Sequence, residues 1–159
     1  MADELVEIER LTEASGLARA IAATQFKLWD VRTGHSSQDA YERFLSAAAR
    51  APSLPSVLVA RRGQRFVGSV NLLASEMTIR PALSPWMGQL LVTDEARGTG
   101  VGRALVGAAI RHVADLGFRR IHLYTSGTLP SYYARLGWKP IEDVSYLGKL
   151  RTVMVFEMP

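Results

Sequence analysis

One stretch of the chain changes from a strand pattern to a helix pattern across a turn that holds three glycines. Residues 86–93 form a mainly apolar run, which favours a buried strand, and apolar residues recur at helical spacing from Gly100 to Leu116. The glycines at 98, 100 and 102 let the backbone approach a ligand closely, and the start of the helix leaves N–H groups unpaired. Because these N–H groups and the helix dipole favour negative charge, the turn predicts an anion site suited to a pyrophosphate.

The patterns on either side of this turn predict a mixed domain around one sheet. We expect Ser36 or Ser37 to cap a helix, and Gly117 and Gly137 to end two others. No linker rich in glycine, serine or proline divides the chain, so we expect one domain over residues 1–159. The predicted order is strand, two helices, three strands, helix, strand, helix and two strands, an α+β or mixed α/β class. The further strands are expected over 4–11, 57–61, 66–73, 120–125, 141–146 and 152–158, and the further helices over 16–30, 37–50 and 130–136.

Composition narrows the location and chemistry of the protein. With 48% apolar and 21% charged residues the chain is expected to fold, and no stretch approaches the roughly 18 apolar residues of a membrane-spanning helix. The acidic start of the chain does not resemble a secretion signal. The absence of cysteine excludes disulfides, thiolate metal sites and a cysteine nucleophile. We therefore expect a cytoplasmic protein without a membrane partner.

Basic residues gather around the glycine turn. The net charge is +4, and Asp115 is the single acid within an arginine-rich segment. This excess suits a phosphorylated small molecule, although arginines solvated on a helix face are an alternative. No aromatic platform is interleaved with the arginines, so nucleic acid is not an expected partner. The clustered arginines are Arg97, Arg103, Arg111, Arg119 and Arg120.

Three phosphate-binding patterns compete for this turn. The P-loop pattern G-x-x-x-x-G-K-[ST] fails because the turn contains no lysine. The dinucleotide pattern G-x-G-x-x-G fails at its third glycine, where Arg103 or Leu105 stands. The pattern [Q/R]-x-x-G-x-[G/A] is met by residues 97–102, and it resembles the pyrophosphate loop of the GCN5-related N-acetyltransferases, the GNAT family.

A second motif strengthens this resemblance. Residues 132–138 resemble the family's box of two aromatic residues, three variable positions, glycine and an aromatic residue. The resemblance covers nearly the whole chain and is strongest from Pro85 to Trp138. It implies a GNAT-like fold, in which a mostly antiparallel, twisted central sheet contains two splayed parallel strands and is flanked by about four helices.

The resemblance also implies acetyl-CoA as acyl donor, without a metal, and direct attack of an amine on the thioester in a ternary complex. Tyr133 aligns with the tyrosine that protonates the leaving thiolate in many family members, with a merely packed aromatic residue as the alternative. Ser126 stands near a position where many members carry asparagine, and it offers one hydroxyl donor. The residues expected to bind the cofactor are Leu90, Val92, Arg97, Gly98, Thr99, Gly100, Val101, Gly102, Arg103 and Ser126.

The base that accepts the amine proton has few candidates. Glu76 follows the third predicted strand, near where the resemblance implies a substrate cleft, and is our first choice; a solvated loop carboxylate is the alternative. His122 lies in an alternating strand run and is expected to be a packed or surface strand residue rather than a base. The three histidines are scattered, so we expect no metal site.

The acceptor is expected to be an amine of a small molecule or a peptide. Trp29, Trp86, Tyr132 and Tyr146 line its cleft or belong to the core, and the sequence leaves both open. An edge strand near the C-terminus would allow a homodimer. The alternative function is a non-catalytic acyl-CoA-binding module that has kept the loop and lost the chemistry.

Overall fold

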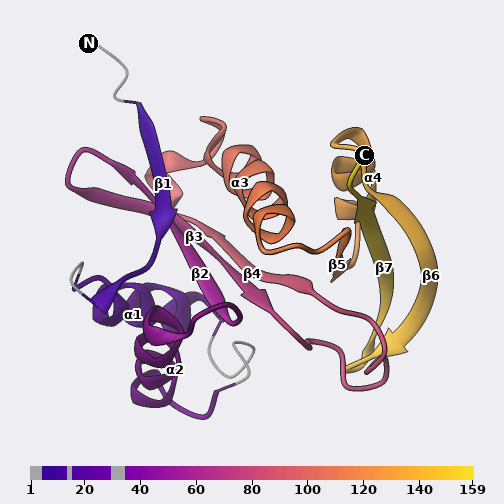
Figure 1. Cartoon of the computed structure of the whole chain (residues 1–159), viewed down its shortest axis with the longest axis horizontal. Helices are drawn as coiled ribbons and strands as arrows, with labels where there is room; N and C mark the ends of the chain where they lie inside the picture. The colour runs from indigo at the N-terminus through magenta and orange to yellow at the C-terminus, as the bar shows by residue number, and fades with distance from the viewer. Residues whose placement is uncertain (1–4, 14–15, 30–34) are drawn as a thin grey trace. The chain divides into compact units, whose positions relative to one another are not determined.

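The computed structural model describes residues 5–13, 16–29 and 35–159, except the side chains of residues 28 and 29 (Figure 1). Its elements follow the predicted order, with an additional short 3-10 helix, η3, before the glycine turn. The last two strands begin at residues 139 and 149, earlier than predicted. The elements are β1 (Val6–Arg10), α1 (Ala18–Trp29), α2 (Gln38–Arg50), β2 (Ser56–Arg62), β3 (Arg65–Leu73), β4 (Trp86–Val92), η3 (Asp94–Ala96), α3 (Val101–Asp115), β5 (Arg120–Thr125), α4 (Leu129–Arg135), β6 (Lys139–Tyr146) and β7 (Lys149–Glu157).

The strands form one seven-stranded sheet in the order β1-β2-β3-β4-β5-β7-β6. The pairs β1–β2, β2–β3, β5–β7 and β6–β7 are antiparallel. The central pair β4–β5 is parallel, and its register consists of Trp86 opposite His122. The predicted fold class, a mostly antiparallel sheet with a parallel pair in the middle, is confirmed.

The chain forms two compact units. The first comprises residues 1–72 and 89–109. Here α1 and α2 pack against β2, and Ile21, Leu45 and Val59 belong to the buried cluster. The Ser37 hydroxyl accepts a hydrogen bond of 3.1 Å from the Ala40 N–H, so Ser37 is the cap of α2.

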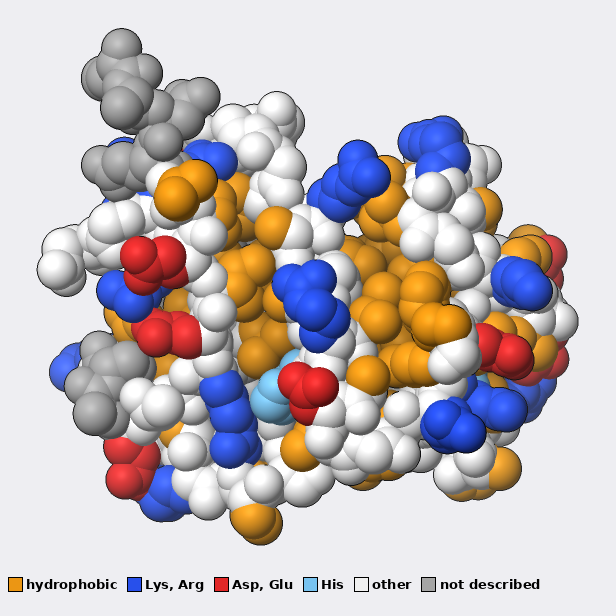
Figure 2. All heavy atoms as spheres, turned by 45° about the horizontal axis from the view of Figure 1, so that its top comes forward, with side chains coloured by type: hydrophobic (Ala, Val, Ile, Leu, Met, Phe, Trp, Pro, Cys, Tyr) orange, Lys and Arg blue, Asp and Glu red, His pale blue; other side chains and the backbone are white. Residues whose placement is uncertain are grey.

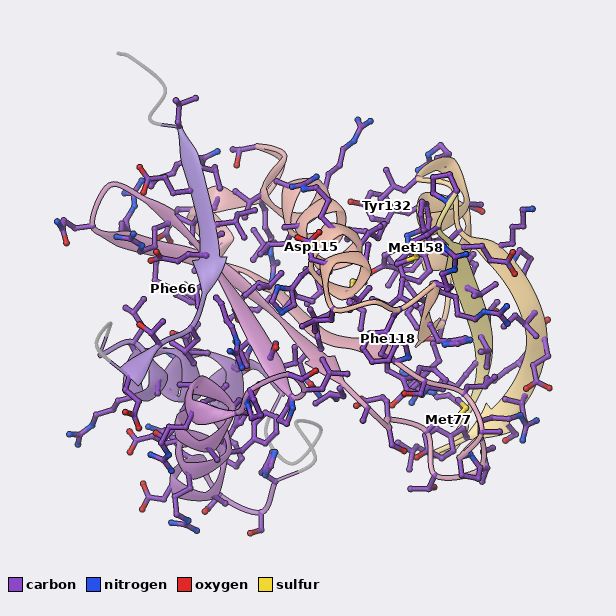
Figure 3. The ribbon with its side chains drawn as sticks, in the orientation of Figure 1. Phe66, Met77, Asp115, Phe118, Tyr132 and Met158 are labelled. Atoms are coloured by element: carbon purple, nitrogen blue, oxygen red, sulfur yellow. The ribbon has the colours of Figure 1, made fainter. Side chains whose placement is uncertain are left out.

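The second unit comprises residues 73–88 and 110–159. Its antiparallel strands β5, β7 and β6 form one arm of the sheet. Met77, Trp86 and Val153 form a buried cluster, and Met77, labelled in Figure 3, belongs to the segment that leads into β4. Gly117 and Gly137 follow α3 and α4 with φ of 97° and 98°, which confirms that glycine ends these helices.

Within the described ranges, no helix is long and apolar enough to cross a bilayer. On the face drawn in Figure 2, Lys and Arg side chains are scattered, with Asp and Glu among them.

Candidate active site

The glycine turn has the backbone geometry that its sequence predicts. Gly98 and Gly100 adopt φ of 74° and 88°, in the left-handed region that favours glycine. A Cβ added at either residue would meet no heavy atom within 4 Å, so the space above the turn is open. The turn begins from η3, where the Arg97 N–H donates to the Asp94 carbonyl over 3.3 Å.

Backbone donors collect where this turn enters α3. The Ala104 N–H donates to the Gly100 carbonyl at 3.0 Å, which begins the hydrogen bonding of the helix. In the described part of the chain, the N–H groups of residues 98–103 have no backbone acceptor. The Thr99 hydroxyl donates to the Ala96 carbonyl, and Arg62 donates to the Thr99 carbonyl at 3.4 Å. The turn is therefore held from outside while its own N–H groups remain available to an anion.

The two arginines of the turn differ in their pairing. Arg97 forms an exposed ion pair with Asp94, with 3.3 Å between Nη2 and Oδ1, and such pairs contribute little in water. Arg103, in the first turn of α3, is exposed and forms no ion pair with the residues described. Its guanidinium adds a cation to the open N–H groups, so the turn fits a pyrophosphate.

The strand before the turn is kinked. Gln89 has φ of 45° although it is not glycine, and it lies in the middle of β4, whose burial does not alternate over residues 86–90. Leu90 and Val92 are half-buried, as strand residues beside a ligand arm would be. Val101 is buried, so its expected part in cofactor binding falls to its backbone.

Tyr133 lies on α4, which follows Thr128 and has proline in its first turn as predicted. Its side chain is 7% exposed and makes edge contacts with Tyr132, labelled in Figure 3, and Trp138, with ring centroids 5.2 and 6.0 Å apart. Burial, and to a lesser degree Tyr132, raises the pKa of Tyr133 to about 12. Its hydroxyl has no hydrogen-bond partner among the described residues, so at neutral pH it is a protonated donor that is not engaged.

Glu76 lies in the segment between β3 and β4. A Cβ added at Gly88 would lie 3.2 Å from its Oε1 atom, so the carboxylate occupies the space that this glycine leaves. Burial raises the pKa of Glu76 to about 7. The carboxylate is half-buried and lies against Gly88, and the role of Glu76 as the base stays a prediction. The same charge helps burial to raise the pKa of Tyr124 to about 12.

The other candidates of the sequence analysis are distributed between site and core. Trp86 is fully buried and belongs to the core, while Tyr132 and Tyr146 are half-buried. The Tyr146 hydroxyl lies 3.2 Å from the Thr78 N–H, which donates to it. Ser126, half-buried, directly follows β5. The side chain of Trp29 lies outside the described residues.

Of the three histidines, His122 is buried, and His35 and His112 are half-buried. His122 is 2% exposed, and its Nδ1 lies 3.1 Å from the Pro85 carbonyl oxygen. Burial lowers the pKa of His122, so the ring is neutral at pH 7. Of the two positions that the strand pattern left open, packed or at the surface, His122 occupies the packed one. Among the residues described, no three His, Asp or Glu side chains could hold a metal ion together.

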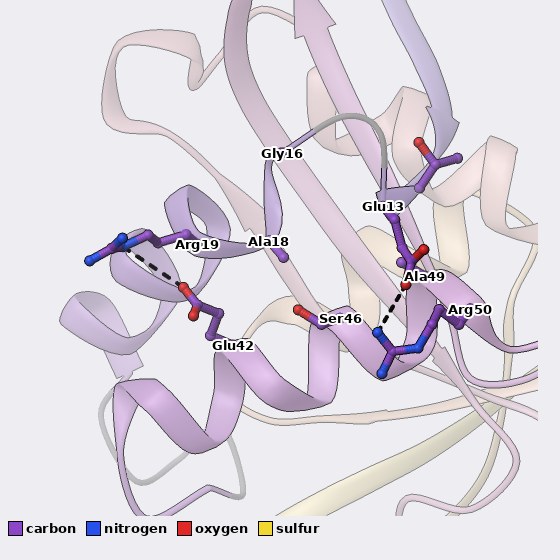
Figure 4. Close-up of a pocket in the computed structure, with 9 residues that line it drawn as sticks. Glu13, Gly16, Ala18, Arg19, Glu42, Ser46, Ala49 and Arg50 are labelled. Carbon is purple, nitrogen blue, oxygen red and sulfur yellow. Dashed lines mark hydrogen bonds and ion pairs between the residues drawn. The ribbon is translucent and has the colours of Figure 1, made fainter.

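A separate cavity of about 330 Å³ lies in the first unit and contains none of the predicted site residues (Figure 4). Arg50 and Glu13 pair across it with 2.9 Å between Nη1 and Oε1, and Arg19 and Glu42 pair with 3.9 Å between Nε and Oε1. Because these four charges are mutually paired, they leave no net charge for a charged ligand. The lining residues are Thr12, Glu13, Gly16, Ala18, Arg19, Glu42, Ser46, Ala49 and Arg50.

The fold is shared with solved structures of acetyltransferases. A GNAT-family acetyltransferase from Streptococcus pneumoniae is 16% identical, with a TM-score of 0.74 over 98% of this chain and 100% of that one. The protein yncA from Salmonella typhimurium, solved with its cofactor acetyl-CoA, is 15% identical, with a TM-score of 0.74 over 98% and 95%. An aminoglycoside 6'-N-acetyltransferase complexed with coenzyme A is 14% identical, with a TM-score of 0.73 over 95% and 96%.

The sequence itself identifies the family. The acetyltransferase (GNAT) domain family matches residues 54–140, more than half of the chain, and this span includes both the glycine turn and the tyrosine box. The chain therefore belongs to the GNAT acetyltransferases, and the resemblance that the two motifs suggested is confirmed. None of the curated proteins matches it.

Proposed function

We propose that the protein is an acetyl-CoA-dependent N-acetyltransferase that acts on a primary amine of a small molecule or a peptide. The observation that carries the proposal is the glycine turn, where the N–H groups of residues 98–103 lack backbone acceptors at the start of α3. Membership of the family supports it, as do the coenzyme A and the acetyl-CoA present in two structures of similar fold. Acetyl-CoA supplies the thioester that the amine attacks.

In this proposal the turn binds the pyrophosphate. The N–H groups of residues 98–103 donate to its oxygens, with Arg97 and Arg103 as cations nearby. Leu90 and Val92 offer backbone groups to the pantetheine arm, and Ser126 offers its hydroxyl. A backbone N–H on β4 polarises the thioester carbonyl.

Glu76 is proposed as the base. Its pKa of about 7 means that a large fraction of the carboxyl is ionised at neutral pH and can accept the proton that the attacking amine loses. As the C–N bond forms and the C–S bond breaks, Tyr133 donates a hydrogen bond to the sulfur. A hydroxyl with a pKa of about 12 holds its proton more tightly than a thiol with a pKa of about 8.5, so Tyr133 stabilises the thiolate more than it protonates it.

Calorimetric titration with acetyl-CoA, with NAD as the control ligand, tests the binding half of the proposal. Micromolar binding of acetyl-CoA and none of NAD is expected, and no binding at millimolar acetyl-CoA would refute the assignment of the turn. A panel of amines, followed by the release of free thiol, then tests transfer and identifies the acceptor.

The second candidate is a non-catalytic acyl-CoA-binding module. It is favoured by Ser126, which provides one hydroxyl where many family members provide an amide. This module would bind acetyl-CoA but release no thiol with any amine, and the Tyr133→Phe variant would behave like the wild type.

A further inference from the structure

Strand β4 contains a strained residue at its centre. Gln89 has φ of 45°, which places a residue with a Cβ in the left-handed region at a cost in free energy. Leu147 is the other non-glycine residue with positive φ in the described ranges, and it lies in the turn between β6 and β7. A left-handed residue is ordinary in a turn, whereas inside a strand it breaks the alternation and redirects the residues that follow.

Two side chains of the same unit hold this kink. Asn71 on β3 donates from Nδ2 to the Gln89 Oε1 atom over 2.9 Å. Gln25 on α1 donates from Nε2 to the Gln89 main-chain carbonyl over 3.4 Å. The kinked residue is therefore fastened at its side chain and at its backbone, from two different elements.

Gln25 and Asn71 are themselves held by a buried network. Gln25 is fully buried, and its Nε2 also donates to the Ser69 hydroxyl at 2.7 Å. The Tyr41 hydroxyl donates to the Gln25 Oε1 atom and accepts from Asn71 Nδ2 at 3.0 Å. These partners fix both amide orientations, so neither side chain can turn without losing a bond.

One atom of the network lacks a partner. Asn71 is 1% exposed, yet its Oδ1 has no hydrogen-bond partner among the described residues. A leucine or valine would avoid this cost, because an unpaired buried acceptor destabilises the fold. Strain at Gln89 and an unpaired acceptor at Asn71 thus occur in one network, and both are typical of sites that serve function.

We propose that Gln25 and Asn71 are positioning residues, which hold the Gln89 kink so that the backbone of residues 90–92 is aimed at the pantetheine arm of acetyl-CoA. The inference rests on the proposed function for its ligand. The network itself is independent of the ligand, since it acts on the shape of β4. Pantetheine carries two secondary amides, and a backbone segment set at a fixed angle can pair with them.

The test compares Asn71→Ala in two backgrounds, the wild type and Gln89→Gly. Glycine adopts φ of 45° without strain, so a kink made by glycine needs no anchor. In the wild-type background we expect Asn71→Ala to speed hydrogen exchange of β4 amides at least tenfold and to weaken acetyl-CoA binding about fivefold. In the Gln89→Gly background we expect both quantities to change less than twofold. Asn71→Leu, which fills the same space, replaces Asn71→Ala if the latter does not fold.

Leu45→Ala serves as the control, because Leu45 is buried in the same unit but belongs to the apolar cluster. It should lower stability equally in both backgrounds. Equal effects of Asn71→Ala in both backgrounds would overturn the proposal and make Asn71 an ordinary core residue. The proposal would also be overturned if the effect of Asn71→Ala on hydrogen exchange differed between the two backgrounds while acetyl-CoA binding did not change. If the wild type binds no acetyl-CoA, the proposed function fails, and so does the proposal that the kink directs β4 toward pantetheine. The hydrogen-exchange data would still decide whether the network holds Gln89.

Discussion

Tyr41 and Tyr133 are both buried tyrosines, but their hydroxyl groups are treated in opposite ways. In the first unit, the Tyr41 hydroxyl donates to Gln25 and accepts from Asn71. In the second unit, the Tyr133 hydroxyl has no hydrogen-bond partner among the described residues, and burial raises its pKa to about 12. A hydroxyl bonded on both sides fixes a shape, whereas an unengaged one is ready for a group that is still to bind. Tyr41 thus contributes to the structure of the first unit, whereas the Tyr133 hydroxyl of the second unit is available to a ligand.

The largest effect should come from Tyr133→Phe. It removes a hydroxyl without breaking a bond within the described chain, so the melting temperature should stay within a degree or two. The kcat should fall about 100-fold or more, in the range of a lost acid–base or thiolate-stabilising group. Steady-state thiol release measures kcat, and calorimetry measures the binding of acetyl-CoA. An unchanged kcat would make Tyr133 a packing residue like any other.

Tyr41→Phe is the matched change in the first unit. It takes the donor from Gln25 Oε1, an atom of a fully buried residue, and should cost about 1–3 kcal/mol of stability. Thermal unfolding should show a melting temperature lower by several degrees. Loss of turnover with unchanged stability would erase the contrast between the two tyrosines.

Glu76→Gln tests the second unit through pH. Below a pKa of about 7 the carboxyl is protonated and cannot accept a proton, so wild-type kcat should rise through pH 7 and level off above it. The variant should lose this limb and fall roughly tenfold at pH 8, where a water molecule can replace the base. A pH profile of the variant with the same limb would assign the titration to another group.

The stability of the same variant provides a second measurement. The pKa of Glu76 is raised from 4.5 to about 7 on folding, so between these values the folded state binds the proton and the unfolded state does not. The stability that protonation of Glu76 contributes to the folded state is therefore complete below pH 4.5 and is lost as the pH rises to about 7. In denaturant titrations at a series of pH values across this range, the free energy of unfolding of Glu76→Gln should decline less with pH than that of the wild type. A parallel decline in wild type and variant would show that Glu76 is not its source.

The smallest effect extends the comparison from side chains to backbone. Gly98→Ala introduces a Cβ at φ of 74° with open space around it, so its cost is strain of about 1–2 kcal/mol and not a clash. The turn should relax and bind acetyl-CoA roughly fivefold more weakly. Gly148→Ala, at φ of 79° in the turn after β6, carries the same strain and should leave binding unchanged. Equal losses of affinity in the two variants would point to general destabilisation.

The sequence predicted the order of the elements and the glycine turn because both depend on local signals. Alternation, helical spacing and glycine conformations are set within a few residues of each other. The short helix η3 escaped prediction because residues 94–96 form a single turn, too brief for any repeat. That the chain is one domain over residues 1–159 remains a prediction.

The candidate site was predicted only in part, because burial depends on contacts between distant residues. Glu76 was chosen as a candidate for its position after a strand, but its raised pKa depends on burial. The place of its carboxylate depends on Gly88, twelve positions further along the chain. Gln25 and Asn71 were missed altogether. Their side chains are polar, and nothing in the sequence separates a buried amide from a solvated one. A left-handed Gln89 carries no signal either, since glycine or asparagine would be expected at such a backbone angle.

The absence of a side chain at Gly88 affects the pKa of Glu76 through the space that it leaves for the carboxylate. Its backbone is not in the left-handed region, so alanine is conformationally admissible there, and the missing methyl group serves only to leave room for the Glu76 carboxylate. A methyl group at this position would lie 3.2 Å from Oε1, so the half-buried carboxylate would have to shift by a few tenths of an ångström. Proton affinity at Glu76 would then be adjusted by volume alone, with every charge in the protein unchanged.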